Sequence, residues 1–188
     1  MSAEVPVSVR NGLLAVLTLG PAYGAQLHTE LGERLGHRRT VNIGQVYATL
    51  DRLGVQGLVR AAGVTDDGLP LYRITDEGRG VVDSALSSAP DGAPDWAEML
   101  DAVLLATSLP GVDARELLQS YRERWAAASG AVIVDTVPQA RLASDATAAL
   151  AEAAIRWLDG VADELAGGGT SLARAYSAAR PRRGRPIA

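Results

Sequence analysis

The sequence contains no cysteine, phenylalanine or lysine, and only 4% of its 188 residues are aromatic. Without cysteine the chain has no disulfide, no thiol nucleophile, and no cysteine-ligated zinc or iron–sulfur site. The scarcity of aromatic residues leaves alanine, leucine and valine to fill a core, which favours helices. With 47% hydrophobic and 21% charged residues, the composition is that of a globular chain with a packed core.

Long hydrophobic runs and catalytic patterns are also missing. No apolar run approaches the length of about eighteen residues that a membrane span needs, and the start, MSAEVPVSVR, lacks the regions of a signal peptide. We therefore expect a cytoplasmic protein. The two histidines, His28 and His37, have no His-x-x-x-His partner or acidic metal cluster, and both are expected at the surface. No glycine loop follows a strand, and no nucleophile turn is recognisable. The sequence predicts neither an enzyme nor a metal or cofactor site.

Charge is unevenly distributed along the chain, whose net charge is −4. Residues 84–173 carry five arginines against thirteen acids, whereas residues 174–188 carry five arginines and no acid. Residues 1–83 are nearly balanced. Because local charge rather than the overall sum attracts phosphate, the negative total does not exclude a nucleic-acid partner.

The first half of the sequence changes from helical to extended patterns and back. Apolar spacing predicts helices over 8–19, 23–35 and 42–53. Two β-prone runs, 58–61 and 69–74, flank the turn signal Asp66-Asp67-Gly68, and DEGRGVVDSAL then resumes a helix. Three helices, a hairpin and a further helix describe a winged helix–turn–helix domain, which we place at residues 1–86.

The third predicted helix has one apolar face and one sparsely polar face. We expect its apolar set to pack on the first two helices: Ile43, Val46, Leu50 and Leu53. Asn42 is the expected N-cap, with Gln45 completing a capping box. The small residues opposite the apolar set let the backbone approach the floor of a DNA major groove, while polar side chains beside them reach bases or phosphates. The predicted DNA-binding residues are Arg38, Arg39, Thr40, Asn42, Gly44, Gln45, Tyr47, Ala48, Arg52, Arg60 and Arg73.

Three motifs occur in order over residues 9–80: Gly20-Pro21-x-Tyr23-Gly24, Tyr47-x-x-Leu50 followed by Arg52-Leu53, and Tyr72-x-x-Thr75-x-x-Gly78. Together they resemble the PadR family of bacterial transcription regulators. The resemblance implies a winged-helix repressor whose target lies near its own gene, and this target often encodes an efflux transporter. Ala25 and Ala48 stand where the family often has an aromatic residue and a proline, and the wing tip is acidic where the family's is frequently basic. We therefore expect Arg60 and Arg73, rather than the wing tip, to contact DNA.

Beyond a turn-rich linker at 87–94, the pattern is helical. Asp95 with Glu98 and Asp113 with Glu116 are expected caps, and another helix is expected after Pro138. Wide apolar stripes predict a dimerisation domain at 95–166, unless the stripes pack on each other within one chain. Exposed tryptophan would also suit a small aromatic effector, although ordinary packing is the alternative. The residues expected at this dimer or effector interface are Trp96, Met99, Val103, Trp157 and Leu158.

Residues 167–188 are expected to be a flexible, arginine-rich tail. Its RGRP stretch resembles the core of an AT-hook, so Arg182, Arg183 and Arg185 are candidate minor-groove contacts; the alternative is a solvated tail with only non-specific affinity. The sequence as a whole predicts a mainly α protein with a β-hairpin wing and a C-terminal helical dimerisation region, acting as a homodimeric repressor on a double-stranded DNA operator. The alternatives are a winged-helix module that binds a partner protein, and a sensor whose main task is drug binding.

Overall fold

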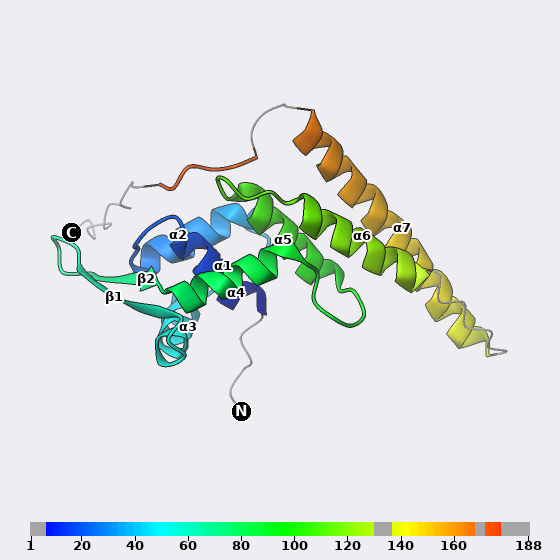
Figure 1. Cartoon of the computed structure of the whole chain (residues 1–188). Helices are drawn as coiled ribbons and strands as arrows, with labels where there is room; N and C mark the ends of the chain where they lie inside the picture. The colour runs from blue at the N-terminus through cyan, green and yellow to red at the C-terminus, as the bar shows by residue number, and fades with distance from the viewer. Residues whose placement is uncertain (1–6, 130–136, 168–171, 178–188) are drawn as a thin grey trace, which may run out of the picture. The chain divides into compact units, whose positions relative to one another are not determined.

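The computed structural model describes residues 7–129, 137–167 and 172–177 (Figure 1). These residues form a mainly helical fold with one small antiparallel sheet, as the sequence predicts. The elements are α1 (Val7–Leu17), α2 (Gly24–Arg34), α3 (Ile43–Val55), β1 (Val59–Val64), β2 (Pro70–Ile74), α4 (Asp76–Ser87), α5 (Trp96–Ser108), α6 (Arg115–Ser129) and α7 (Pro138–Ala166). The described residues divide into two compact units, one within Met1–Val82 and Arg174–Ala188 and the other within Asp83–Ala173. The division falls inside α4, ahead of the linker expected at 87–94.

The core of the first unit lies between α1, α2 and α3, which pack against one another in all three pairings. Each helix contributes leucines that are almost fully buried, among them Leu14, Leu31 and Leu50. The connection between α1 and α2 contains Gly20, whose φ of 151° lies in the region that favours glycine. This trio of helices is the helix–turn–helix that the apolar spacing predicts.

The hairpin is joined to the helices through an additional backbone contact. Val59 pairs with Ile74, Arg60 with Arg73 and Ala61 with Tyr72 in antiparallel register. Tyr72 also exchanges two backbone hydrogen bonds with Ala22, of 2.9 and 3.1 Å, on the α1–α2 connection. The wing is therefore held against the helix–turn–helix at its base.

The third sequence motif has a structural explanation at the start of α4. The Thr75 hydroxyl donates to the Gly57 carbonyl at 2.8 Å and accepts from the Gly78 N–H at 3.1 Å. A Cβ on Gly78 would lie 2.3 Å from the carbonyl oxygen of Leu58. Thr75 thus ties α4 to the hairpin, and only glycine permits the close approach of the two.

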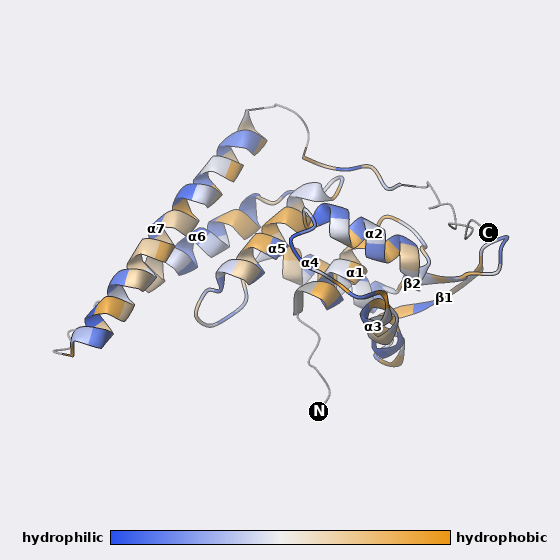
Figure 2. Cartoon of the chain, turned by 180° about the vertical axis from the view of Figure 1, so that it is seen from behind, coloured by the Kyte–Doolittle hydropathy of each residue, from blue (hydrophilic) through white to orange (hydrophobic). Residues whose placement is uncertain are grey.

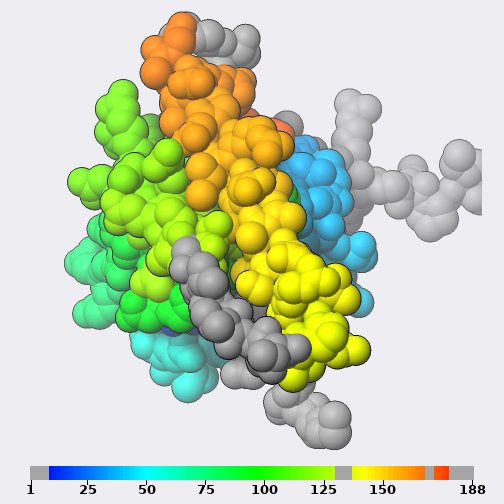
Figure 3. All heavy atoms as spheres, turned by 90° about the vertical axis from the view of Figure 1, so that its right-hand side faces the viewer, coloured from blue at the N-terminus to red at the C-terminus, as the bar shows by residue number. Residues whose placement is uncertain are grey.

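The second unit is built from α5, α6 and α7, with α6 and α7 side by side (Figure 3). The predicted cap Asp95 is confirmed, because it accepts from the Glu98 N–H at 2.8 Å. Asp113 accepts at 3.1 Å from the N–H of Arg115, one residue before the Glu116 that the sequence pairs with it. The Trp125 ring N–H contacts the Met99 sulfur at 3.0 Å in the core. The expected linker is held to α6, since Ser120 accepts from the Ala89 N–H and Arg124 pairs with Asp91.

Candidate nucleic-acid interface

The N-terminus of α3 is capped by Asn42, as predicted. The Asn42 side-chain oxygen accepts from the Gly44 N–H at 2.8 Å, and the Asn42 carbonyl accepts from the Gln45 N–H at 2.9 Å. The carboxamide oxygen of Asn42 is therefore engaged in the helix cap. Its amide nitrogen is the group that a DNA contact would use.

The buried face of α3 differs from the prediction at its first residue. Val46, Leu50 and Leu53 are buried as expected, but the Ile43 side chain is 41% exposed, so its predicted packing is wrong. At 100° per residue, Ile43 lies about 70° from the centre of the buried stripe and at the open end of the first turn. Thr49 is buried instead, and its hydroxyl donates to the Gln45 carbonyl at 2.7 Å.

The outward face of α3 carries small residues in the first half of the helix. Gly44 and Ala48 are exposed in its middle, with Arg52 exposed on one flank. Asp51 and Val55 are also exposed on this side, and neither is among the predicted DNA-binding residues. A carboxylate beside small residues is an acceptor for the cytosine amino group, so the face combines donors and acceptors.

Gly24 and Tyr47, which belong to two different sequence motifs, pack against each other between α2 and α3. Tyr47 is half-buried, and its ring fills the space where a Cβ on Gly24 would lie, only 2.5 Å from ring carbons. Burial, and then the nearby Asp51 and Tyr47, raise the pKa of Tyr72. The ring of Tyr47 therefore fixes the angle at which α3 leaves α2.

Replacing Gly24 with alanine is expected to lower the free energy of unfolding by about 1–3 kcal/mol, since the rigid Tyr47 ring must move. Urea denaturation measures this. Gly54, on α3, is the matched control, because no atom lies within 4 Å of the position that a Cβ would take there. Gly54→Ala is expected to stabilise the protein by up to about 1 kcal/mol through helix propensity. Equal stabilisation by both substitutions would disprove the packing role of Gly24.

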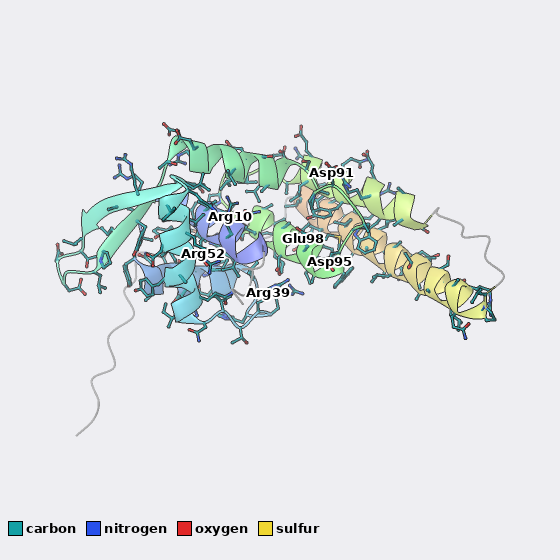
Figure 4. The ribbon with its side chains drawn as sticks, turned by 90° about the horizontal axis from the view of Figure 1, so that it is seen from below. Arg10, Arg39, Arg52, Asp91, Asp95 and Glu98 are labelled. Atoms are coloured by element: carbon teal, nitrogen blue, oxygen red, sulfur yellow. The ribbon has the colours of Figure 1, made fainter. Side chains whose placement is uncertain are left out.

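The connector before α3 carries the predicted phosphate contacts. Arg38 and Thr40 are exposed, whereas Arg39 is half-buried with a buried Nε. His28 Nε2 lies 2.7 Å from the carbonyl oxygen of Val41, which requires this nitrogen to carry the proton. His28 thus holds the connector to α2 and is half-buried, whereas the sequence predicts a surface position for it. Figure 4 shows Arg39 in the connector and Arg52 on α3.

Arg60 and Arg73 form a pair of like charges on the wing. They are directly opposite each other across β1 and β2, on the face away from the buried pair Val59 and Ile74, and both are exposed. Like charges in opposite positions destabilise a hairpin. Among the described residues neither arginine forms an ion pair, so this face of the wing presents two guanidinium groups to an anion.

The five residues expected at a dimer or effector interface separate into two groups. Met99, Val103 and Leu158 are buried within the second unit of this chain, so they pack on their own chain instead of forming a free surface. Trp96 and Trp157 remain half-exposed, and their ring centroids lie 5.9 Å apart with planes inclined by 57°. Two tryptophans from different helices therefore form an accessible aromatic surface.

Three predictions concern sites other than α3 and the wing. Arg182, Arg183 and Arg185 lie outside the described residues. Within the described ranges, no group of three or more His, Asp or Glu residues is placed to hold a metal ion. None of the helices described is both long and apolar enough to cross a membrane.

Comparison with known proteins finds a family match in the N-terminal region. The model of the Transcriptional regulator PadR-like family matches residues 13–84. Bacillus subtilis PadR in complex with operator DNA is 17% identical, with 84% of this chain and 98% of that chain covered and a TM-score of 0.41. The PadR-like regulator BC1756 from Bacillus cereus is 20% identical, with 88% and 99% covered and a TM-score of 0.42. Bacillus subtilis PadR in complex with p-coumaric acid is 17% identical, with 87% and 99% covered and a TM-score of 0.39. No curated protein matches the chain. Residues 13–84 of the chain thus match the model of the PadR-like family of transcriptional regulators.

Proposed function

We propose that the chain is a homodimeric DNA-binding transcription regulator, a repressor that inserts α3 of each copy into the major groove of an operator. The observation that carries the proposal is the outward face of α3, where Gly44 and Ala48 have small side chains. Small side chains at these positions let the backbone of the helix approach base edges closely. In a helix–turn–helix the second helix, here α3, is the one that enters the groove. The family match of residues 13–84 supports the same role.

Base contacts would come from exposed and half-exposed side chains of α3. Arg52 suits the two acceptors of guanine, and Gln45 suits adenine. Ile43, exposed at the first residue of the helix, suits a thymine methyl group. Gly44 and Ala48 leave room for the backbone between these contacts.

Phosphate contacts would come from both sides of α3. Arg38, Arg39 and Thr40 precede the helix, and Arg60 with Arg73 follow it on the wing. The acidic turn Asp66-Asp67 would stay away from the phosphates. One copy makes few such contacts, so useful affinity requires two copies on one duplex.

A second copy of the chain would pack against the exposed side of α7. Leu142 and Leu150 are exposed, and with Ala146, Ala153 and the half-exposed Trp157 they recur every three or four residues, as on one side of a helix. In Figure 2, apolar residues recur between polar ones along α7. Trp96 and Trp157 would offer a small aromatic effector a surface for stacking, which quenching of tryptophan fluorescence by flat aromatic cations tests.

A gel-shift titration tests the proposed function. The full-length protein is titrated with the duplex upstream of its own gene and with a shuffled duplex of equal composition, at low and near-physiological salt. Tight binding to the native duplex that survives moderate salt supports the proposal. Equal and salt-labile binding to both duplexes contradicts it and favours a winged-helix module that binds a partner protein.

Replacing Arg52 with alanine is expected to weaken binding to the cognate duplex by about 1–3 kcal/mol while leaving binding to the shuffled duplex nearly unchanged. The reason is that a bidentate contact to one base is lost. Titration of both duplexes measures the difference. An equal loss on both duplexes would mean that Arg52 holds a phosphate.

A further inference from the structure

Residues 174–177, which we call the arm, belong to the first unit and lie along α2. Ser177 is bound to this helix through both of its backbone groups. Its N–H donates to the Glu30 carboxylate at 2.9 Å, and its carbonyl accepts from the Gln26 side chain at 3.0 Å. The arm falls in the stretch that the sequence predicts to be a flexible tail, and these hydrogen bonds hold one end of it in place.

The other end of the arm is bound one to two turns further along α2. The Arg34 guanidinium donates to the Arg174 carbonyl at 3.2 Å, and the Arg174 guanidinium pairs with Glu33. Gln26 and Arg34 are eight residues apart, so the attachment points span about 12 Å of the helix. The arm therefore runs antiparallel to α2 and is fastened to it at both ends.

The face of α2 that holds the arm contains a buried ion pair. Glu30 and Arg34 are one turn apart, 3.1 Å from each other, and only 2% and 3% exposed. Buried charges need partners for their remaining hydrogen-bonding groups. The arm supplies a backbone N–H to Glu30 and a backbone carbonyl to Arg34. Because both partners belong to the backbone of the arm, the arm and the ion pair fix each other's position.

Tyr176 lies between the two attachment points of the arm. Burial, followed by the nearby Glu30 and Tyr23, raises the pKa of Tyr176 to about 12 against an opposing effect of Arg34. The hydroxyl oxygen is buried and has no hydrogen-bond partner among the described residues. Packing of the half-buried ring, rather than a hydrogen bond, therefore holds Tyr176 in place.

The opposite face of α2 holds α3 and the connector before it. At 100° per residue, Gly24 and His28 lie about 120° and 160° from Glu30 around the helix. Gly24 packs against the ring of Tyr47, and His28 Nε2 lies 2.7 Å from the carbonyl oxygen of Val41. The helix α2 thus lies between the arm on one face and α3 with its connector on the other.

The position of α2 matters for DNA binding because α3 is attached to it. In a helix–turn–helix, the second helix lies in the major groove and presents side chains to base edges. A bidentate contact between a side chain and a base requires a fixed geometry, to within about 0.5 Å. A displacement of α2 would carry Tyr47 and Val41, and with them the first turns of α3, out of that geometry.

We propose that the arm is a positioning element of the recognition helix. Docked on the face of α2 away from α3, it holds α2 where Gly24 and His28 set α3 for base contacts, and Tyr176 is the residue that anchors it. The arm acts through α2 without contacting DNA, which distinguishes it from a basic tail that adds phosphate contacts. This inference rests on the proposed function.

Hydrogen exchange in the full-length protein without DNA tests the positioning. Tyr176→Ala removes the ring that anchors the arm, whereas Tyr176→Phe removes only an unpartnered hydroxyl. We expect the amides of residues 38–48 to exchange about tenfold faster in Tyr176→Ala, because the partial burial of an aromatic ring is lost. Tyr176→Phe should exchange at the wild-type rate. Unchanged exchange at 38–48, or equal acceleration in β1, β2 and the second unit, would overturn the inference.

Titration of the upstream and shuffled duplexes tests the consequence for DNA binding. We expect Tyr176→Ala to lower affinity for the upstream duplex about tenfold, the effect of one weakened base contact, with little change on the shuffled duplex. Tyr176→Phe should bind like the wild type. In the presence of Arg52→Ala, Tyr176→Ala should cost much less, because a displaced α3 cannot lose a base contact that is already absent. Additive losses, present on both duplexes, would mean that the arm contacts DNA itself and would contradict the inference.

The two measurements separate failure of the inference from failure of the proposed function. If the wild type prefers the upstream duplex and Tyr176→Ala keeps the same affinity and preference, the inference fails alone. If the wild type shows no preference, the proposed function fails, and the exchange rates at residues 38–48 still decide whether the arm holds α3.

Discussion

Replacing Glu30 with alanine is expected to lower the free energy of unfolding by about 3–5 kcal/mol, one of the largest effects of any single substitution in the first unit. The substitution leaves the Arg34 guanidinium buried without its carboxylate, and it also removes the acceptor of the Ser177 N–H. A buried charge that loses its partner retains the full cost of its desolvation. Urea denaturation followed by circular dichroism measures the change.

Glu33 is the matched control for Glu30. It lies on the same helix and also pairs with an arginine, Arg174, but in a more exposed position. Glu33→Ala should therefore cost no more than about 1 kcal/mol. Replacing the buried pair together, as Glu30→Leu with Arg34→Met, should recover much of the stability lost by Glu30→Ala. Similar losses from Glu30→Ala and Glu33→Ala would show that burial does not govern the pair.

Reversing both wing arginines, as Arg60→Glu with Arg73→Glu, is expected to reduce affinity for the upstream duplex on the order of 100-fold at near-physiological salt. The change removes two phosphate contacts from each copy and adds repulsion. It should also flatten the dependence of affinity on salt. Stability should change little, because the opposite positions still carry like charges. Titrations over a range of salt concentrations measure both quantities.

The single substitution Arg73→Glu separates DNA binding from stability. It places opposite charges across the hairpin, so it should stabilise the protein by up to about 1 kcal/mol while weakening DNA binding. Arg141→Glu with Arg156→Glu on α7 changes the net charge as much as the double wing variant and controls for overall charge. Equal weakening by the α7 and wing variants would rule out a specific wing contact.

Local sequence patterns predict most of the winged helix. Cap residues such as Asn42 and Asp95 act within three residues, and the turn before Leu69 is set by its own residues, so their structures follow from short stretches. Glycine at position 24 has a different basis, because the Tyr47 ring on α3 leaves no space for a side chain there. The motif therefore indicates the domain, while its physical reason appears only in three dimensions.

Predictions that depend on distant packing are less accurate. Ile43 has the right residue type for the core of α3, but the start of the helix leaves it outside the buried stripe. Met99 and Leu158 lie on apolar stripes that look like a surface for a second copy, yet other helices of the same chain cover them. Glu30 and Arg34 have the spacing of an ordinary exposed helix pair. Two of their hydrogen-bond partners, the backbone groups of Ser177 and Arg174, lie about 140 positions later, which no local pattern reveals.

The return of the chain to α2 limits the modularity of this regulator. A fragment ending at residue 86 would contain every element of the winged helix but not Arg174 and Ser177, whose backbone groups are hydrogen-bonded to Arg34 and Glu30. Exchange of DNA-reading domains between regulators, by recombination or in a designed chimera, would therefore have to transfer two separate segments of the gene. Residues 174–177 would have to stay complementary to α2, although the helices that lie between α2 and these residues in the sequence could diverge.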